Sequence, residues 1–271
     1  MAKRLIISID GGGIRGIIPL VILRSIQYRL KKNLNEISTS WYGTSTGSII
    51  AAGLLTQQEK DFSVAIQNIL DIYEFRSASS INPFGTTNPA RALNILLEEN
   101  FSSFEFKEFP KLNIVSCQLP DLKSTVFNSQ NNVPMVDAVK ASCAVPGIFE
   151  AVQIGNKKYI DGFVTAKNPA HIAIQNELLN DDLILLSLGT GILKQFDDIE
   201  KQVRQTHLDL ELLSKEKGFH YFRMNPHLVL AADDMQNTTL KNIFSLKKDA
   251  ENFMKEKEGR FEELVGILGG I

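Results

Sequence analysis

Apolar residues along the first two thirds of the chain fall into short continuous runs that alternate with longer helical patterns. Residues 5–9 and 183–188 are apolar almost throughout, which is typical of strands buried on both faces of a sheet. Residues 17–30 and 49–55 each follow a glycine-rich turn and are apolar nearly all round, as buried helices are. This alternation predicts an α/β fold of three layers, with helices on both faces of a mainly parallel central sheet.

The last third of the chain is more charged. Residues 195–216 and 238–268 are amphipathic at helical spacing, and Lys and Glu share their polar faces. The mixed charge favours helices packed on the sheet over helices that lie on a membrane surface. With 271 residues, 44% of them hydrophobic, the chain can bury a large core. We expect a single domain over residues 1–271, with a sheet core at about 5–193 and a helical part at about 194–271.

Charge and cysteine content restrict the function classes. Twenty-nine basic and 31 acidic residues give a net charge of -2, which provides no overall field for nucleic acid. Cys117 and Cys143 lie in apolar stretches and form neither a zinc motif nor a disulfide framework. The first apolar run is interrupted at Asp10, too early for a signal peptide, and no run reaches the length of a membrane-spanning helix. We expect a cytoplasmic protein without metal or cofactor, and peripheral contact with membranes.

A serine lies in a short glycine motif between a predicted strand and a buried helix. Residues 43–47, Gly-Thr-Ser-Thr-Gly, match the pattern G-x-S-x-G, in which a strained turn lifts a serine hydroxyl clear of the sheet. Gly43 and Gly47 would allow that turn, and Ser45 is the candidate nucleophile. The same residues also fit an ordinary helix N-terminus with Ser or Thr caps, so the motif needs support from the rest of the chain.

A glycine cluster follows the first predicted strand, in residues 10–16. Gly11, Gly13 and Gly16 match the dinucleotide-binding pattern G-x-G-x-x-G. That pattern needs an acidic residue at the end of a second strand about twenty residues later, whereas Glu36 lies in a polar stretch. Consecutive glycine N–H groups at a helix N-terminus stabilise a transient oxyanion as well as a phosphate. We therefore favour an oxyanion hole over a cofactor site.

A serine nucleophile needs a proton acceptor, which is usually a histidine. Only His171 of the four histidines lies in the apolar part of the chain, and it falls inside a predicted helix, which disfavours a Ser-His-Asp triad. Asp161 ends a predicted strand, and Gly162 after it permits close approach to another turn. A buried carboxylate beside a serine can act as the base alone. Asp161-Gly162 also fits an ordinary turn.

Together, these three motifs resemble those of the patatin-like phospholipases. The resemblance runs from residue 5 to residue 193 and is weaker in the final third. Further matching segments are residues 141–146 with Phe149, Asn168-Pro169 and residues 187–191, and less distinctively residues 221–223 and 233–234.

The resemblance implies a lipid acyl hydrolase of the phospholipase A or lysophospholipase type, on a sheet of the patatin and cytosolic-phospholipase type. Such enzymes hydrolyse phospholipids or other acyl lipids through a Ser-Asp dyad and an acyl-enzyme, without histidine or metal. By motif, Ser45 would be the nucleophile and Asp161 the base, and Arg15 would hold the glycine loop. The oxyanion hole would be formed by Gly11, Gly12 and Gly13.

Two residues depart from the family pattern. Phe163 stands where a small residue is usual, so it would either narrow the acyl cleft or pack inward. Lys167 stands where a second Asn is common, and a cation at the mouth of the site would favour anionic head groups. Phe84, in a polar loop, is a candidate for contact with lipid.

Two alternative functions stay open. The chain could be a membrane-degrading effector that is dormant until a signal molecule or partner activates it, or a non-catalytic lipid- or nucleotide-binding module on the same fold. The sequence identifies no activator and no oligomeric state.

Overall fold

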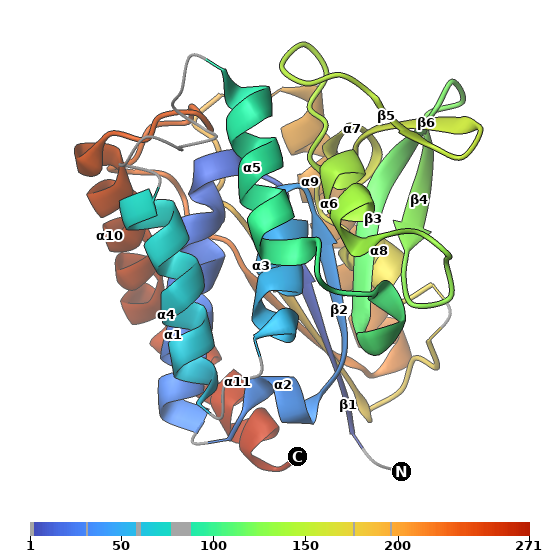
Figure 1. Cartoon of the computed structure of the whole chain (residues 1–271). Helices are drawn as coiled ribbons and strands as arrows, with labels where there is room; N and C mark the ends of the chain where they lie inside the picture. Colours follow the sequence, from blue (N-terminus) through green and yellow to red (C-terminus); the bar gives the residue numbers. More distant parts are fainter. Residues whose placement is uncertain (1–2, 31, 58–60, 77–87, 176, 196) are drawn as a thin grey trace.

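One mixed sheet runs through the part of the chain that the structure describes (Figure 1). The computed structural model describes residues 3–30, 32–57, 61–76, 88–175, 177–195 and 197–271. Phe84 lies outside these residues. The strands are β1 (Arg4–Ile9), β2 (Ser38–Thr44), β3 (Leu112–Leu119), β4 (Lys123–Phe127), β5 (Val152–Ile154), β6 (Lys157–Asp161), β7 (Leu183–Leu188) and β8 (His220–Met224).

Helices connect most of the strands. The α-helices are α1 (Ile17–Leu30), α2 (Leu34–Ile37), α3 (Thr46–Thr56), α4 (Phe62–Asp71), α5 (Pro89–Phe101), α6 (Met135–Ser142), α7 (Phe163–Ala166), α8 (Ala170–Ala173), α9 (Asp198–Lys217), α10 (Leu240–Glu256) and α11 (Glu258–Gly269). Two short 3-10 segments, η1 (Gly13–Gly16) and η3 (Phe106–Glu108), and one π-helical turn, η2 (Ile72–Arg76), complete the described elements.

The strand order is β5-β6-β3-β2-β1-β7-β8, with β4 also paired to β3. Strands β3, β2, β1, β7 and β8 are parallel to one another, whereas β3 pairs with β4 and β6, and β5 pairs with β6, in antiparallel fashion at one side. The prediction of a mainly parallel sheet is confirmed. Parallel strands place their carboxyl ends at one edge, where α/β proteins bind ligands.

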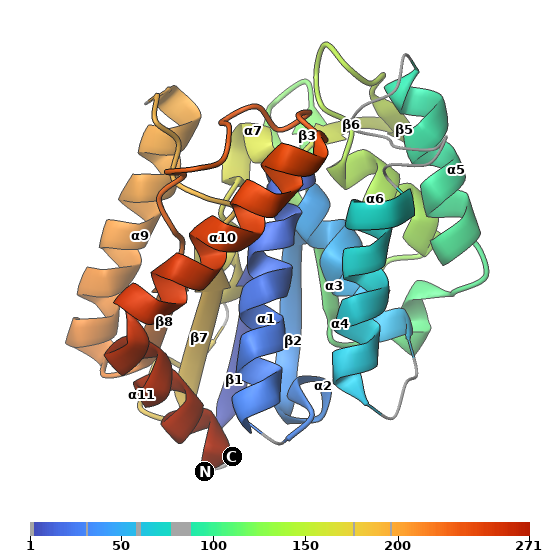
Figure 2. The same ribbon diagram turned by 90° about the vertical axis from the view of Figure 1, so that its left-hand side faces the viewer.

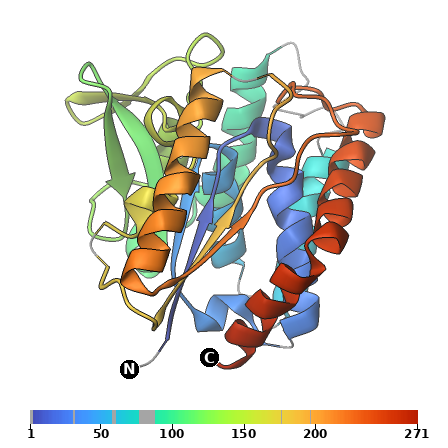
Figure 3. The ribbon, with the colours of Figure 1, turned by 180° about the vertical axis from the view of Figure 1, so that it is seen from behind.

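The two faces of the sheet bury separate cores. In β1, Ile7 and Ile9 belong to the core shared with α1, α3 and α4, whereas Ile6 belongs to a second core with α8 and α9. Figure 2 shows α1, α4 and α10 over one face, and Figure 3 shows α9 on the other. The predicted three-layer fold is therefore confirmed.

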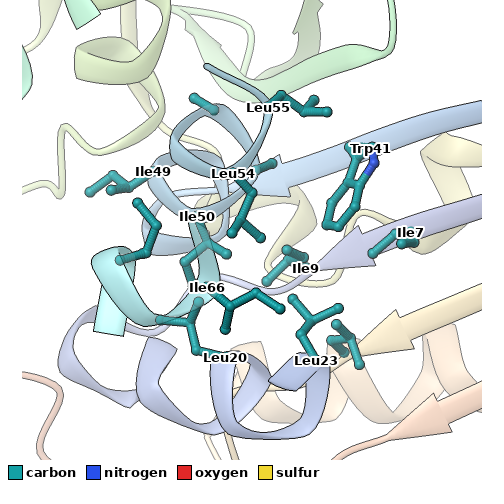
Figure 4. Close-up of a cluster of buried hydrophobic side chains, with 14 of the residues drawn as sticks. Ile7, Ile9, Leu20, Leu23, Trp41, Ile49, Ile50, Leu54, Leu55 and Ile66 are labelled. Atoms are coloured by element: carbon teal, nitrogen blue, oxygen red, sulfur yellow. The ribbon is translucent and has the colours of Figure 1, made fainter. Parts of the chain in front are cut away.

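The larger core fixes the helix that carries Ser45. Figure 4 shows Ile50 and Leu54 of α3 close to Ile66 of α4 and to Trp41 of β2. All four side chains are fully buried, and the Trp41 indole N–H also donates to Ser38 Oγ at 2.7 Å. Close packing of this kind fixes the beginning of α3 at the edge of the sheet formed by the carboxyl ends of the parallel strands.

The C-terminal helices pack on the body of the protein, as the mixed charge predicts. The helix expected over residues 238–268 is divided into α10 and α11, because Lys257 leaves helical geometry (φ -102°, ψ 27°). The buried Asp249 carboxylate of α10 accepts the N–H groups of Val229, Leu230 and Ala231 at 3.0–3.1 Å. No helix among the described residues is long and apolar enough to cross a bilayer.

Candidate active site

Ser45 occupies a strained turn between β2 and α3. Its φ of 54° and ψ of -122° lie in a region that residues with a side chain rarely adopt, and its side chain makes no capping hydrogen bond. Gly43 and Gly47 flank it so closely that a Cβ on either glycine would overlap neighbouring backbone. This geometry is that of the G-x-S-x-G turn rather than of an ordinary capped helix N-terminus.

Three further residues fix the backbone of this turn. Ser45 N donates to Ser142 Oγ at 2.9 Å, and that hydroxyl donates to Val115 O at 2.6 Å. Ser48 Oγ donates to Ser45 O at 2.6 Å. Sequence reasoning did not identify Ser142, although it lies in a matching segment, because its contact with Ser45 joins positions 97 residues apart.

Strand register brings Asp161 to the same place. Thr44 pairs with Val115 across β2 and β3, and Asp161 pairs with Ser116 across β3 and β6. Strand β6 runs antiparallel to β3 and therefore ends at the level of the serine turn. Gly162 permits this contact, because a Cβ there would overlap Val115 O.

The Asp161 carboxyl is fully buried with few partners. Oδ1 accepts the Phe163 N–H at 2.8 Å, and Oδ2 has no hydrogen-bond partner among the described residues. Burial raises the pKa of Asp161 to about 7, although the Ser45 hydroxyl and the Phe163 N–H both lower it. The Ser45 hydroxyl therefore lies close enough to lower the pKa of Asp161, but the two side chains do not form a hydrogen bond in this structure. Such bonds are often long until substrate binds.

The glycine loop lies against the serine. A Cβ on Gly11 would come within 3.2 Å of Ser45 Cβ. Gly13 has a φ of 59°, and a Cβ there would overlap Met235 O, which accepts the Ile14 N–H at 3.0 Å. Within the described residues, the N–H groups of Gly12 and Gly13 donate to no backbone acceptor outside the helical elements. These amides are the candidates for binding an oxyanion.

Gly11 and Lys167 differ from the sequence expectation. The Gly11 N–H already donates to Lys167 O at 3.0 Å, so it is not free for an oxyanion in this structure. The Lys167 ammonium is buried and paired with Glu200 at 2.8 Å, rather than placed at a mouth. Burial makes an unpaired lysine costly, and Glu200 of α9 supplies the carboxylate. Arg15 is buried and its Nε donates to Gly12 O at 3.2 Å, which ties it to the loop.

A second buried ion pair lies beside the loop. Both terminal nitrogens of Arg223 in β8 contact the Asp10 carboxylate, at 2.8 and 2.5 Å, and Arg223 also donates to Ser187 Oγ at 2.8 Å. Sequence reasoning placed Arg223 in a segment of weak family similarity but did not pair it with Asp10, 213 positions away. The pair holds the beginning of the glycine loop against β7 and β8.

Ser45 opens into a small apolar cavity of about 30 Å³. Its lining comprises Gly13, Ser45, Thr46, Ile49, Leu93, Cys143, Val145, Ile148, Phe149, Met235 and Gln236. Phe163 is half-buried and outside this lining, so it does not narrow the cavity. His171 is exposed on α8 and also lies outside the lining. Burial raises the pKa of the Cys143 thiol, so this neighbour of the serine stays protonated.

Comparisons with known proteins give one matching family model and several similar proteins. The family model described as patatin-like phospholipase matches residues 7–174. Patatin group D-3 and patatin-08 of Solanum tuberosum are each 27% identical over 300 positions, covering 93% of this chain and 76% of the relative. The solved structure of human GIVD cytosolic phospholipase A2 has a TM-score of 0.55 at 9% identity, covering 99% of this chain and 60% of that chain. This last likeness is one of fold.

Proposed function

Because this chain belongs to the patatin-like phospholipase family, we propose that it is a lipid acyl hydrolase in which Ser45 and Asp161 form a catalytic dyad within a single domain. Family membership supports the hydrolysis of lipids. One observation carries the finer proposal: a serine at a strained turn lies beside a buried carboxyl whose Oδ2 has no hydrogen-bond partner in the described part of the chain, and burial raises the pKa of that carboxyl to about 7. A base with a pKa near the working pH is well suited to proton transfer.

The reaction would proceed through an acyl-enzyme. Asp161 takes the proton of Ser45 as the hydroxyl attacks the ester carbonyl, and the alcohol part of the lipid leaves with a proton from Asp161. Asp161 then accepts a proton from water as the water attacks the acyl-enzyme, and it returns that proton to Ser45 Oγ as the fatty acid is released. The N–H groups of Gly12 and Gly13 would bind the oxyanion in both steps, and Arg15 would hold them through the Gly12 carbonyl.

The substrate would be an ester lipid at a membrane surface, which the chain would contact peripherally. The small cavity at Ser45 is lined mainly by apolar side chains, which supports an apolar acyl group beside the reacting atoms. An activator is not part of this proposal, because no observation on the described residues identifies one.

Covalent labelling combined with lipid hydrolysis tests the dyad's nucleophile. Wild-type protein is exposed briefly to a fluorophosphonate and weighed by intact-mass spectrometry, beside Ser45→Ala and the exposed-serine control Ser102→Ala. We expect one adduct on wild type and control and none on Ser45→Ala, with the same pattern for fatty acid released from mixed phospholipid vesicles. A folded wild type that gives neither adduct nor fatty acid would contradict the proposal and favour a non-catalytic binding module.

A further inference from the structure

A wide groove runs along α3 beside the small cavity at Ser45. It encloses about 600 Å³, within the range of about 300–1,000 Å³ that is usual for ligand sites. Its apolar surface comes from α3, α4, α5 and the segments after them: Ile49, Gly53, Ile69, Ile72, Leu96, Phe101 and Phe104. Polar side chains line it as well, including the carboxyl groups of Asp71 and Glu99, and Asn68 donates to Gln57 at 2.7 Å across its end. The groove therefore combines apolar and polar side chains in nearly equal number.

Ile49 is common to the groove and to the cavity at Ser45. It lies one helical turn after the serine and is only 4% exposed. Figure 4 shows its side chain on the outer side of α3, away from Trp41. On the facing helix α5, Leu93 lines the cavity and Leu96 lines the groove. The two spaces are thus neighbours, separated by one aliphatic side chain.

The cavity alone cannot hold a lipid. Its volume of about 30 Å³ is far below the roughly 300–1,000 Å³ that is usual for ligand sites. A fatty acyl group esterified to Ser45 must therefore extend into an adjoining space. The groove extends along α3 from Ile49 to Thr56, a distance of about 10 Å at 1.5 Å per residue.

We propose that the groove between α3, α4 and α5 binds the fatty acyl chain of the substrate, and that Ile49 and Leu96 select for its length. This inference rests on the proposed function and adds the place where the acyl tail lies. The apolar side chains of the groove remove methylene groups from water, and the polar side chains keep the groove from being an exposed apolar patch. Burial of successive methylenes in the groove is the source of chain-length selectivity.

A tail-labelled inhibitor locates the acyl chain directly. The probe is a long-chain alkyl fluorophosphonate with a diazirine at the far end of its tail, which labels Ser45 and is then photolysed. We expect cross-links to peptides of α4 and α5 that contain Ile69, Leu96 or Phe101. Cross-links confined to residues 145–149 or 235–236 would overturn the groove assignment. Failure to form the serine adduct at all would instead count against the proposed function.

Substitution in the groove tests selectivity. Leu96→Trp fills the groove, and we expect it to lower the ratio of kcat/KM for a p-nitrophenyl palmitate over a butyrate by at least about tenfold. Val64→Trp is the matched control, because Val64 is exposed on α4 and does not line the groove. A ratio for Leu96→Trp that equals the control would overturn the proposal.

A second substitution covers the case in which Leu96→Trp does not fold, which far-ultraviolet circular dichroism detects. Ile49→Ala widens the connection between cavity and groove, so the palmitate-to-butyrate ratio should rise several-fold relative to wild type. An unchanged or lower ratio in folded Ile49→Ala would contradict the inference. Active-site concentration is set in every variant by a small fluorophosphonate without a long tail.

Discussion

Asp10 and Asp161 are both buried carboxyls beside strand ends of one sheet, and a glycine follows each, yet their surroundings are opposite. Asp10 faces Arg223, which contacts both carboxylate oxygens. Asp161 accepts one backbone N–H, and its second oxygen has no hydrogen-bond partner among the described residues. The same dipeptide, Asp-Gly, therefore holds an aspartate that forms an ion pair at position 10 and an aspartate without a charged partner among the described residues at position 161.

The difference shows that burial alone does not make a base. The pKa of both carboxyls is raised above its usual value, with burial as the largest cause, and at Asp10 the charge and hydrogen bonds of Arg223 oppose burial. At Asp161 the opposing groups are neutral, and the pKa remains at about 7. A carboxyl that can both gain and lose a proton near neutral pH is the one available for chemistry.

The largest expected effect is on rate. Asp161→Asn should lower kcat for ester hydrolysis by more than about 10³-fold, because the amide cannot accept the Ser45 proton. The substituted side chain can still accept the Phe163 N–H, so the fold should persist. The measurement is hydrolysis of a short soluble ester by protein whose circular dichroism matches wild type.

Asp121→Asn, in an exposed turn, is the control and should retain the wild-type rate. If Asp161→Asn also kept nearly full activity, another group would have to be the base. The different surroundings of Asp10 and Asp161 would then have no consequence for catalysis.

The second prediction concerns stability, where the same substitution should have opposite effects at the two sites. Asp10→Asn leaves the Arg223 charge buried without its counter-ion and should lower the free energy of unfolding by about 3–5 kcal/mol. Asp161→Asn should instead raise it at pH 8. The folded pKa of Asp161 lies above its unfolded value, so its stabilising contribution is complete below about pH 4 and is lost as pH rises through 7.

Urea unfolding at pH 8 and at pH 4 measures both effects. The advantage of Asp161→Asn over wild type should be a few kcal/mol at pH 8 and should largely disappear at pH 4. A loss of stability at pH 8 in both variants would show that the two carboxyls are held in the same way.

Local sequence patterns were informative where a single turn determines the geometry. The motif around Ser45 specifies a strand, a glycine-flanked turn and a helix within a few residues, and these form as predicted. The strand before Asp161 is likewise apparent from residues 157–161. In both cases neighbouring residues determine the backbone, so a pattern of a few positions is sufficient.

Contacts between distant segments could not be predicted in that way. The partners of Asp10 and Lys167, which are Arg223 and Glu200, lie 213 and 33 positions away and are brought in by sheet order and by α9. For the same reason the sequence could not indicate that Lys167 O occupies the Gly11 N–H. The sequence shows which side chains are charged, but the partner of each buried charge is determined by how the fold packs.

The third prediction sharpens the comparison at the loop that follows Asp10. Gly13→Ala should lower kcat by about 10²-fold, because the added Cβ overlaps Met235 O and displaces an oxyanion donor. Gly155→Ala is a matched control: Gly155 has a φ of 60°, close to that of Gly13, but no atom within 4 Å of the added Cβ. A similar small change in kcat for both variants would mean that the Gly13 amide does not contact the reacting ester.

The smallest expected effect, about tenfold per pH unit, decides which carboxyl limits the rate. The base must be ionised, so kcat/KM for a soluble ester should rise tenfold per unit up to about pH 7, the pKa of Asp161, and be level above it. A profile that is flat from pH 5 to pH 8 would contradict the assignment of Asp161 as the base. A rise in kcat/KM up to about pH 7 would identify Asp161 as the base.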